Sequence, residues 1–446
     1  MRRMPRRMRL LPVLEGLHSA EAFNPGFLRA FLERTRALEA GPAEFQDALA
    51  GRVIATVFEE PSTRTRLSFE SAALRLGAGV ISVADPKTSS AVKGESLRDT
   101  ARIVSGYSDL IVWRHPRDGA SRLAAQAAQV PVINGGDGRI GHPTQTLLDL
   151  YTLYREWGDL AGRTVGLMGD LRNGRTARSL AWGLALLEAR VLQLPAPGLA
   201  WEASFEQRIA DRAGYALRHV RHPLFRTWTG EETARVLEPR LATQGWLFGD
   251  GVPLLERLDA LYLTRLQEER GAAPRDGVYP GLRPAHLADP LLEQCLLLHP
   301  LPRRQELPEE LDEDPRARYF EQARNGVLAR QALYLAMLRA ERWPLPELTP
   351  LPAGHPDAEL GVCPNPNCIT RAEGIPVPWR VAGKVQRLFL CAYCDALLPV
   401  DYAGCRSTLR LHPLHSPSVA RIHPENLRPF RAREAAQRQG YTWSEA

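Results

Sequence analysis

The segment that decides the fold is Phe58-Glu59-Glu60-Pro61-Ser62-Thr63-Arg64-Thr65-Arg66. It follows the β-rich run Val53–Phe58 and precedes a stretch of helical character, so it predicts a strand, a turn and a helix. Free N–H groups and the positive dipole end at a helix N-terminus attract an anion. Hydroxyls and guanidinium groups match phosphate oxygens. A capped helix with surface arginines is the alternative interpretation, but Arg64 and Arg66 beside the hydroxyls favour a phosphate site.

Strand-like and helical stretches alternate on both sides of this segment. Residues from about 20 to 50 have helical periodicity, and a helix is expected over 144–157. Further strands are predicted at 79–83, 110–113, 130–134, 164–170, 260–264 and 295–299. The predicted fold class is α/β, with two doubly wound parallel-sheet domains followed by a small β-rich zinc module.

The length of 446 residues allows two or three domains. We expect a first domain over 1–150, completed by a C-terminal helix at about 325–343, and a second over 151–324. A proline-rich linker at 344–360 and a four-cysteine module at 361–408 follow. Residues 409–446 are rich in Arg, His and Pro and are expected to pack poorly, and residues 195–250 show no pattern that predicts a structure.

Composition limits the class of protein. The chain is 44% hydrophobic and 24% charged, which is typical of soluble globular proteins, and no apolar run reaches the roughly 20 residues that span a membrane. Glu15 interrupts the apolar stretch near the N-terminus, so a signal peptide is not expected. The expected location is the cytoplasm. The net charge of +6 fits either nucleic-acid binding or an enzyme with anionic substrates.

Two more polar motifs stand at the ends of predicted strands. Arg114-His115-Pro116 follows the strand at 110–113, and His142-Pro143-Thr144-Gln145 leads into the helix at 144–157. Ligands collect at the carboxyl ends of strands in open α/β sheets, so these motifs and Ser62–Thr65 predict one crevice. A single histidine is more often structural, but His142 stands beside other polar groups.

Together the three motifs resemble the carbamoyl-phosphate half of the transcarbamoylase family. Four later segments resemble the branch of that family that uses aspartate: Ser89–Glu95, Gly169–Thr176, Leu263–Gln267 and His299–Arg303. The ornithine branch usually has a cysteine where Leu301 stands. The resemblance covers residues 10–340 and is weakest over 190–255.

The resemblance implies a role for each matching residue. Carbamoyl phosphate would be bound by Ser62, Thr63, Arg64, Thr65, Arg114, His142 and Gln145, with Ser89 and Lys93 reaching in from a neighbouring subunit. Aspartate would be bound by Lys93, Arg175, Arg265, Gln267 and the backbone around Leu301. Catalysis would depend on Arg64, Thr65, Arg114, His142 and Lys93, and Glu60 would tie the domains together through Arg175 and Arg270. A shared site implies a homo-oligomer, either a trimer or a dimer of trimers.

Four cysteines form two close pairs about twenty residues apart: Cys363, Cys368, Cys391 and Cys394. This spacing predicts a closed, structural zinc site, with disulfides as the alternative. The segment resembles the zinc domain of the regulatory chain found in the aspartate branch. The proline-rich linker stands where that chain has a nucleotide-binding domain, so control by ATP or CTP is not expected. Cys295 is expected in the core, and Cys405 falls outside the spacing.

The expected activity is carbamoyl transfer from carbamoyl phosphate to L-aspartate, with no cofactor for the chemistry. A transcarbamoylase with another acceptor and a non-catalytic zinc-containing scaffold are the alternatives. Nucleic-acid binding is not expected, because few basic residues and no aromatic platform flank the cysteines.

Overall fold

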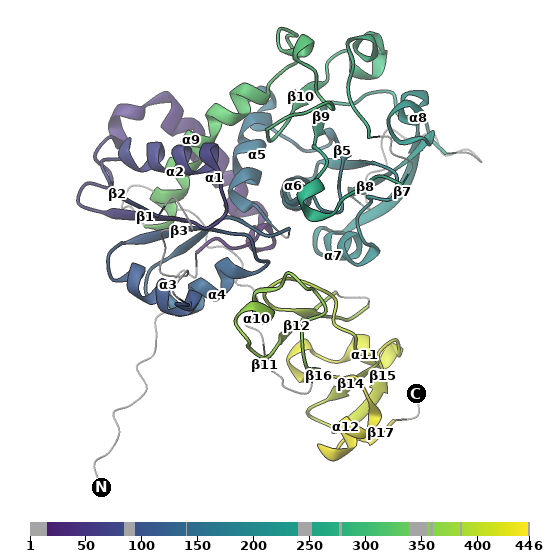
Figure 1. The fold of residues 1–446 in the computed structure, drawn as a ribbon. Coiled ribbons are helices and arrows are strands. Elements are labelled where there is room, and N and C mark those ends of the chain that lie inside the picture. The colour runs from purple at the N-terminus through teal and green to yellow at the C-terminus, as the bar shows by residue number, and fades with distance from the viewer. Residues whose placement is uncertain are drawn as a thin grey trace.

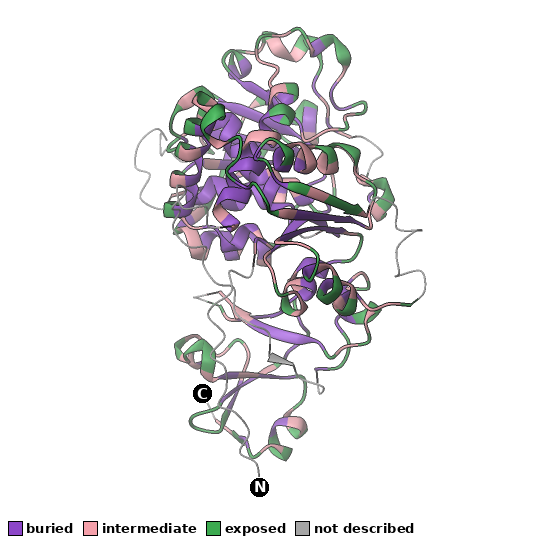
Figure 2. Ribbon diagram, turned by 90° about the vertical axis from the view of Figure 1, so that its left-hand side faces the viewer, coloured by how far each residue is buried: buried purple, intermediate pink, exposed green. Residues whose placement is uncertain are grey.

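The computed structural model describes residues 16–83, 94–139, 141–239, 252–275, 279–338, 355–356, 360–383 and 386–444. Figure 1 shows two α/β domains side by side and a smaller β-rich module beneath them. In Figure 2 the buried residues gather in the strands and on the inward sides of the helices. In the described residues, no helix is both long and apolar enough to cross a membrane.

The first domain is built on a parallel sheet of order β2-β1-β3-β4. Its strands are β1 (Val53–Phe58), β2 (Gly79–Val83), β3 (Leu110–His115) and β4 (Val132–Asp137). Its helices are η1 (Ala20–Ala22), α1 (Pro25–Ala40), η2 (Pro42–Phe45), α2 (Thr63–Leu74), α3 (Leu97–Ser105), α4 (Ala120–Ala127) and α5 (Pro143–Trp157).

Alternation along the strands divides the core between the two faces of this sheet. Ile54 and Phe58 of β1 pack with α1, α2 and α5, whereas Ala55 and Val57 face α3, α4 and the C-terminal module. Both faces are apolar because both are covered, as expected for a parallel sheet.

The second domain has a sheet of order β10-β9-β5-β6-β8-β7. Its strands are β5 (Thr164–Gly169), β6 (Arg190–Pro195), β7 (Tyr215–Arg221), β8 (Thr233–Pro239), β9 (Ala260–Leu263) and β10 (Leu296–Leu298). Its helices are α6 (Arg175–Leu186), α7 (Ala203–Ala213), α8 (Pro223–Thr229), η5 (Glu268–Arg270), η6 (Pro284–Ala288), η7 (Pro290–Leu292) and η8 (Glu309–Leu311). The α/β fold class is confirmed, with one departure: β8 runs antiparallel to both β6 and β7.

Helix α9 (Tyr319–Met337) links the two domains. It begins earlier than the expected 325, packs against α2 and α5 of the first domain and also contacts β10 of the second (Figure 1). Residues 195–239, for which no structure was predicted, form α7, β7, α8 and β8.

The C-terminal module contains two small sheets. The first is β11 (His355–Pro356), β12 (Pro378–Ala382) and β13 (Leu388–Cys391), with α10 (Ile369–Ala372) nearby. The second has the order β16-β14-β15-β17, made by β14 (Tyr402–Cys405), β15 (Arg410–Pro413), β16 (Leu427–Phe430) and β17 (Thr442–Trp443), with α11 (Pro417–Arg421), η10 (Pro424–Asn426) and α12 (Arg433–Arg438).

The expectation that residues 409–446 pack poorly was wrong for the described residues. Leu411, Phe430, Ala436 and Tyr441 form a core of their own, and the Phe430 and Tyr441 rings lie 5.0 Å apart. The expected boundary at 408 falls inside the β14–β15 hairpin. Each strand is only two to four residues long, too short to give a periodic signal in a sequence window.

The module is docked on the first domain and shares an apolar core with it. The Asp118 N–H donates to the Asn367 carbonyl at 3.1 Å, and the Ile369 N–H donates to the Asp118 carbonyl at 3.0 Å. Arg122 of α4 donates to both carboxylate oxygens of Asp395, at 2.8 and 3.2 Å. The two backbone hydrogen bonds and the bidentate ion pair hold the module on the first domain, and their directionality also fixes its orientation.

Candidate active site

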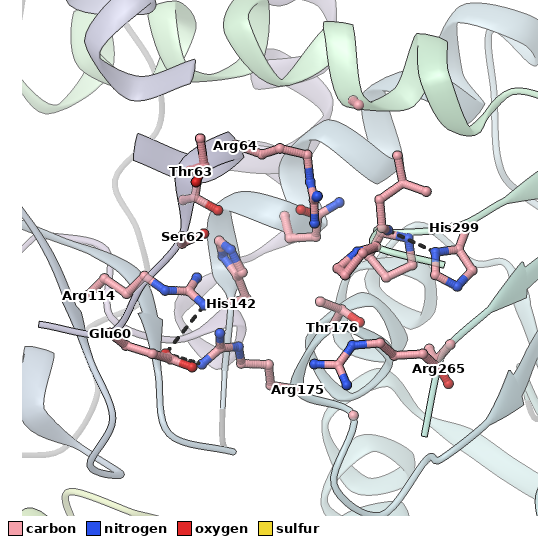
Figure 3. Close-up of a pocket in the computed structure, with 18 of the residues that line it drawn as sticks. Glu60, Ser62, Thr63, Arg64, Arg114, His142, Arg175, Thr176, Arg265 and His299 are labelled. Carbon is pink, nitrogen blue, oxygen red and sulfur yellow. Dashed lines mark hydrogen bonds and ion pairs between the residues drawn. The ribbon is translucent and has the colours of Figure 1, made fainter. Parts of the chain in front are cut away.

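A cleft of about 530 Å³ lies between the two α/β domains. Residues at or just after the carboxyl ends of β1, β3, β4, β5, β9 and β10 line it, and Figure 3 shows side chains converging from both sides. The predicted residues that the structure brings to this cleft are Glu60, Ser62, Thr63, Arg64, Thr65, Arg114, His142, Gln145, Arg175, Arg265, Gln267, Arg270 and Leu301. Ser89 and Lys93 lie outside the described residues.

Three helices begin at the cleft without a side-chain cap. The N-cap residues of α2, α5 and α6 are Ser62, His142 and Gly174, and none of them accepts a hydrogen bond from its own helix through a side chain. The first N–H groups of each helix are therefore not used by a capping side chain, and the three dipoles direct positive charge at one place. This arrangement suits a polyanion such as a phosphate.

The cleft is strongly cationic. Six arginines and two glutamates are among its lining residues: Arg64, Arg114, Arg175, Arg265, Arg270, Arg330, Glu60 and Glu269. Burial and the charge of Arg265 lower the pKa of Arg64, although the two side chains come from different domains (Figure 3). An anion between these arginines would relieve their repulsion, so the cleft is suited to negatively charged ligands.

Glu60 holds the two domains together at the floor of the cleft. Its Oε2 lies 3.1 Å from Arg175 Nη1 and 3.3 Å from Arg114 Nη2. Burial raises the pKa of Glu60, but the charges of Arg175, Arg114 and Arg270 outweigh it and the net pKa is lowered. The structure differs from the expected pairing with Arg270, which instead donates to the Asn173 carbonyl at 2.8 Å.

Arg114 is buried, and not all of its guanidinium donors have a hydrogen-bond partner among the described residues. Its Nη1 donates to the Gly135 carbonyl at 3.1 Å, whereas its Nε has no hydrogen-bond partner among the described residues. Burial and the charge of Arg175 lower its pKa to about 9, against the opposing effect of Glu60. At Gly136 (φ +116°) a Cβ atom would lie 2.9 Å from Arg114 Nη1, so only glycine leaves room for this side chain.

His142 is held as a neutral imidazole. Burial, then the charges of Arg175 and Arg114, lower its pKa well below the usual value. The backbone N–H of His142 donates to Ser179 Oγ at 3.0 Å, and the Thr144 hydroxyl lies 3.3 Å from the ring Nδ1. A Thr144 hydroxyl that donates to Nδ1 leaves the ring proton on Nε2, from where it can be donated to a ligand.

The second-domain side of the cleft presents Arg265 and the loop after β10. The Leu301 N–H donates to His299 Nδ1 at 2.8 Å, and His299 Nε2 lies 2.9 Å from Glu306 Oε1. Leu301 has φ +52°, which is costly for a leucine and typical of a loop held in shape for a ligand. Because its N–H is engaged, Leu301 offers a ligand only its carbonyl oxygen.

Several cleft residues had no predicted role, among them Thr176, Glu269, Gln322 and Arg330. Thr176 stands inside a segment that was recognised as a motif. Gln322 and Arg330 lie eight residues apart on α9, about two helical turns, and so share a face. A helix placed at about 325–343 leaves Gln322 out, and it does not show which of its faces meets the cleft.

Arg265 is occupied by an internal carboxylate. Its Nη1 donates to Glu269 Oε2 at 2.9 Å, and that hydrogen bond keeps the pKa of Glu269 low, at about 2. A ligand carboxylate must displace Glu269, which is half exposed, so the competition amounts to less than about 1 kcal/mol.

We expect Glu269→Gln to lower the KM of a carboxylate substrate up to about fivefold. Steady-state kinetics would measure this, with Glu268→Gln as the control because Glu268 pairs with Arg304. An unchanged KM in both variants would contradict it.

The four predicted metal-ligand cysteines meet in the C-terminal module. The sulfur atoms of Cys363, Cys368, Cys391 and Cys394 lie within 4.8 Å of one another, and all four residues are buried. Two of the sulfur pairs lie 3.5 and 3.8 Å apart, far more than the roughly 2.05 Å of a disulfide, and none of the four cysteines forms a disulfide. The geometry favours a four-thiolate metal site over the disulfide alternative. Cys295 is buried in the core, as expected.

Comparisons with known proteins agree with this architecture. Residues 16–155 match the family model described as the aspartate/ornithine carbamoyltransferase carbamoyl-P binding domain, and residues 252–337 match its Asp/Orn binding domain. An aspartate carbamoyltransferase catalytic subunit from Thermoplasma acidophilum is 43% identical over 297 residues, 66% of this chain and 87% of that protein. The chain belongs to the aspartate carbamoyltransferase family.

Solved structures of aspartate carbamoyltransferases (aspartate transcarbamoylases) have the same fold. The catalytic subunit of the M. jannaschii enzyme is 33% identical, with a TM-score of 0.57, over 74% of this chain and 99% of that one. The Trypanosoma cruzi enzyme in complex with carbamoyl aspartate and phosphate is 32% identical, with a TM-score of 0.59, over 72% of this chain and 94% of that one.

The C-terminal module has its own match in this family. Residues 359–401 match the metal binding domain of the aspartate carbamoyltransferase regulatory chain. The chain therefore joins catalytic-chain domains and a regulatory-chain metal-binding domain in one polypeptide.

Proposed function

We propose that this chain transfers the carbamoyl group of carbamoyl phosphate to the α-amine of L-aspartate, an early step of pyrimidine synthesis. The observation that carries the proposal is the cleft itself. Uncapped helix ends and Arg64 face Arg265 across it, so two anionic reactants can be held side by side. The names of the relatives support the same reaction, and the carbamoyl aspartate and phosphate bound to the Trypanosoma cruzi enzyme correspond to its products.

The reaction is acyl transfer. The amine attacks the carbonyl carbon, a tetrahedral oxyanion forms, and phosphate leaves. In this proposal Thr65, Arg114 and His142 donate to the carbonyl oxygen, and Ser62–Arg64 hold the phosphate at the start of α2; all of them line the cleft. None of the described cleft motifs offers an obvious general base, and the leaving phosphate can accept the proton. Holding both reactants in position supplies several kcal/mol more.

The test is a carbamoylation assay of the purified protein with carbamoyl phosphate and a panel of amino acids. Aspartate should be the preferred acceptor. Preference for ornithine would favour the other branch, and an inactive but correctly assembled protein would favour the scaffold alternative.

Shared active sites are part of the proposal, with Ser89 and Lys93 acting in a neighbouring subunit of a trimer or a dimer of trimers. The outer face of α2 supports an interface, because Leu67 and Leu74 are more than half exposed there.

A mixture of Lys93→Ala and Arg114→Ala proteins tests the sharing. Every mixed trimer rebuilds one intact site, so random reassembly of equal amounts should give about a quarter of wild-type activity, whereas each variant alone is nearly inactive. Activity that stays at the level of the single variants in verified mixed trimers would contradict shared sites.

We propose zinc as the metal of the four-cysteine site. A tetrahedron with Zn–S bonds of about 2.3 Å has S···S edges of about 3.8 Å, close to the distances observed. With four thiolates and no open position the metal would be structural, and mass spectrometry should find one zinc per chain.

We also propose a cytoplasmic location, since cysteines that are not joined in disulfides suit a reducing compartment.

A further inference from the structure

Asp149 lies beneath the cleft and is not one of its lining residues. It is completely buried on α5, one helical turn after Gln145. Its Oδ1 accepts a hydrogen bond from Gln145 Nε2 at 2.8 Å and another from Gln322 Nε2 of α9 at 2.6 Å. Both glutamines line the cleft, so one buried carboxylate supports two cleft residues from different helices.

A carboxylate can only accept hydrogen bonds, so each glutamine must turn its NH₂ group toward Asp149. The carbonyl end of each amide then points elsewhere. Gln322 Oε1 accepts from the His299 N–H at 3.0 Å. Gln145 Oε1 makes no hydrogen bond with the described residues, and it is the one acceptor of this set that is available to a ligand.

We propose that Asp149 is a positioning residue that determines specificity. By holding the NH₂ group of Gln145, it directs Gln145 Oε1 into the cleft, where that oxygen accepts a hydrogen bond from the N–H of the carbamoyl group. It thereby selects carbamoyl phosphate over acyl phosphates that carry a methyl group there. The inference rests on the proposed function and deepens it. Acetyl phosphate has nearly the same shape and charge but no N–H donor, so it leaves Gln145 unpaired, and selection of about tenfold or more is expected.

The protonation of Asp149 should control this selection. Burial raises its pKa to about 7, although the hydrogen bonds from Gln322 and Gln145 oppose the shift. The other ionisable groups that face it are Arg330 of α9 and Tyr262 of β9. Burial lowers the pKa of Arg330 only to about 10 and raises that of Tyr262 well above its usual value, so neither titrates between pH 6 and 8.

Protonation removes the negative charge that holds both glutamine NH₂ groups at Oδ1, so the Gln145 amide is held less firmly and can turn. Since the folded-state pKa is near 7, selection should be complete above that pH and should fall as the pH drops through it.

The experiment compares the Kd of carbamoyl phosphate with that of acetyl phosphate from pH 6 to 8.5, in the full-length protein. Both ligands carry the same phosphate group, so its own titration largely cancels in the ratio. The wild-type ratio should favour carbamoyl phosphate by about tenfold more at pH 8.5 than at pH 6. Asp149→Asn should show a low ratio that does not change with pH.

Thr152→Val is the matched control. Thr152 is also buried on α5 and accepts a hydrogen bond from Asn325 of α9 at 3.0 Å, one turn further from the cleft. It should lose stability but keep the wild-type ratio. A wild-type ratio that is flat with pH, or an Asp149→Asn ratio equal to wild type, would overturn the inference. The wild-type series decides even if the variant does not fold. Failure to bind either ligand would instead refute the proposed function.

Discussion

Replacing Arg114 by alanine should lower kcat by about 10²- to 10³-fold. The reason is that Arg114 is a preorganised donor in a site that excludes water: it is 7% exposed, and its Nε has no partner among the described residues. Such donors act on the charge that develops in the transition state, so kcat should fall more than KM for carbamoyl phosphate rises. Steady-state kinetics with both substrates near saturation would measure this.

The fold should survive this change, because Glu60 keeps Arg175 as its partner at 3.1 Å. Arg66→Ala is the matched control. Arg66 belongs to the same strand–turn–helix segment but lies 3.8 Å from Glu70 on α2 and does not line the cleft. A kcat within threefold of wild type for Arg114→Ala, with a native melting temperature, would show that Arg114 only holds Glu60 in place.

Much of this cleft could be predicted because its residues stand at strand ends. A β-rich run that stops at Phe58, followed by hydroxyls and arginines, gives both the turn and the start of α2. The same reasoning placed Arg114 and His142 beside it, and the structure brings all three segments to one cleft. Their individual roles in catalysis stay predictions.

The contacts between domains could not be predicted in the same way. Glu60 was expected to meet Arg270, yet Arg114 takes that place and Arg270 turns to the Asn173 carbonyl. Several arginines compete for one carboxylate here: Arg270 also lowers the pKa of Glu60 through its charge, but Arg114 and Arg175 form the ion pairs. No periodic pattern in the sequence carries that information.

The C-terminal sheet shows a second limit. Three of its four strands, β15, β16 and β17, lie in the Arg-rich segment 409–446, where nothing local predicts them, and a core of Leu411, Phe430, Ala436 and Tyr441 stabilises the sheet. Their order β16-β14-β15-β17 is set by pairing between distant residues, not by local propensity. A window of sequence contains one strand at a time and misses the sheet.

Glu21→Gln should be the most destabilising substitution in the contacts that join the three parts of the molecule. Glu21 of η1 lies 3.0 Å from Arg208 of α7 and 2.6 Å from Arg380 of β12, and so links the first domain to both the second domain and the C-terminal module. Arg380 continues to Asp395 at 2.8 Å, and Asp395 to Arg122. All five side chains are nearly buried.

The five groups carry three positive and two negative charges, so loss of one carboxylate leaves three buried guanidinium groups with a single partner. Breaking a buried pair in this way costs about 3–5 kcal/mol, because the remaining charges are neither hydrated nor paired. Glutamine keeps the shape of Glu21 but not its charge, so the effect isolates electrostatics from packing. The urea midpoint of the full-length protein should fall accordingly.

The metal content separates this effect from damage to the four-cysteine site. Since the ion pairs of Glu21 run to Arg208 and Arg380 and not to the four cysteines, the bound metal should be retained in native buffer while the module undocks at a lower urea concentration. Glu202→Gln is the control: Glu202 pairs with Arg178 at 2.7 Å but is half exposed, so its loss should cost less than about 1 kcal/mol. Equal urea midpoints for the two variants would mean that the buried network contributes no more than a surface ion pair, and that the shared apolar core alone holds the module in place.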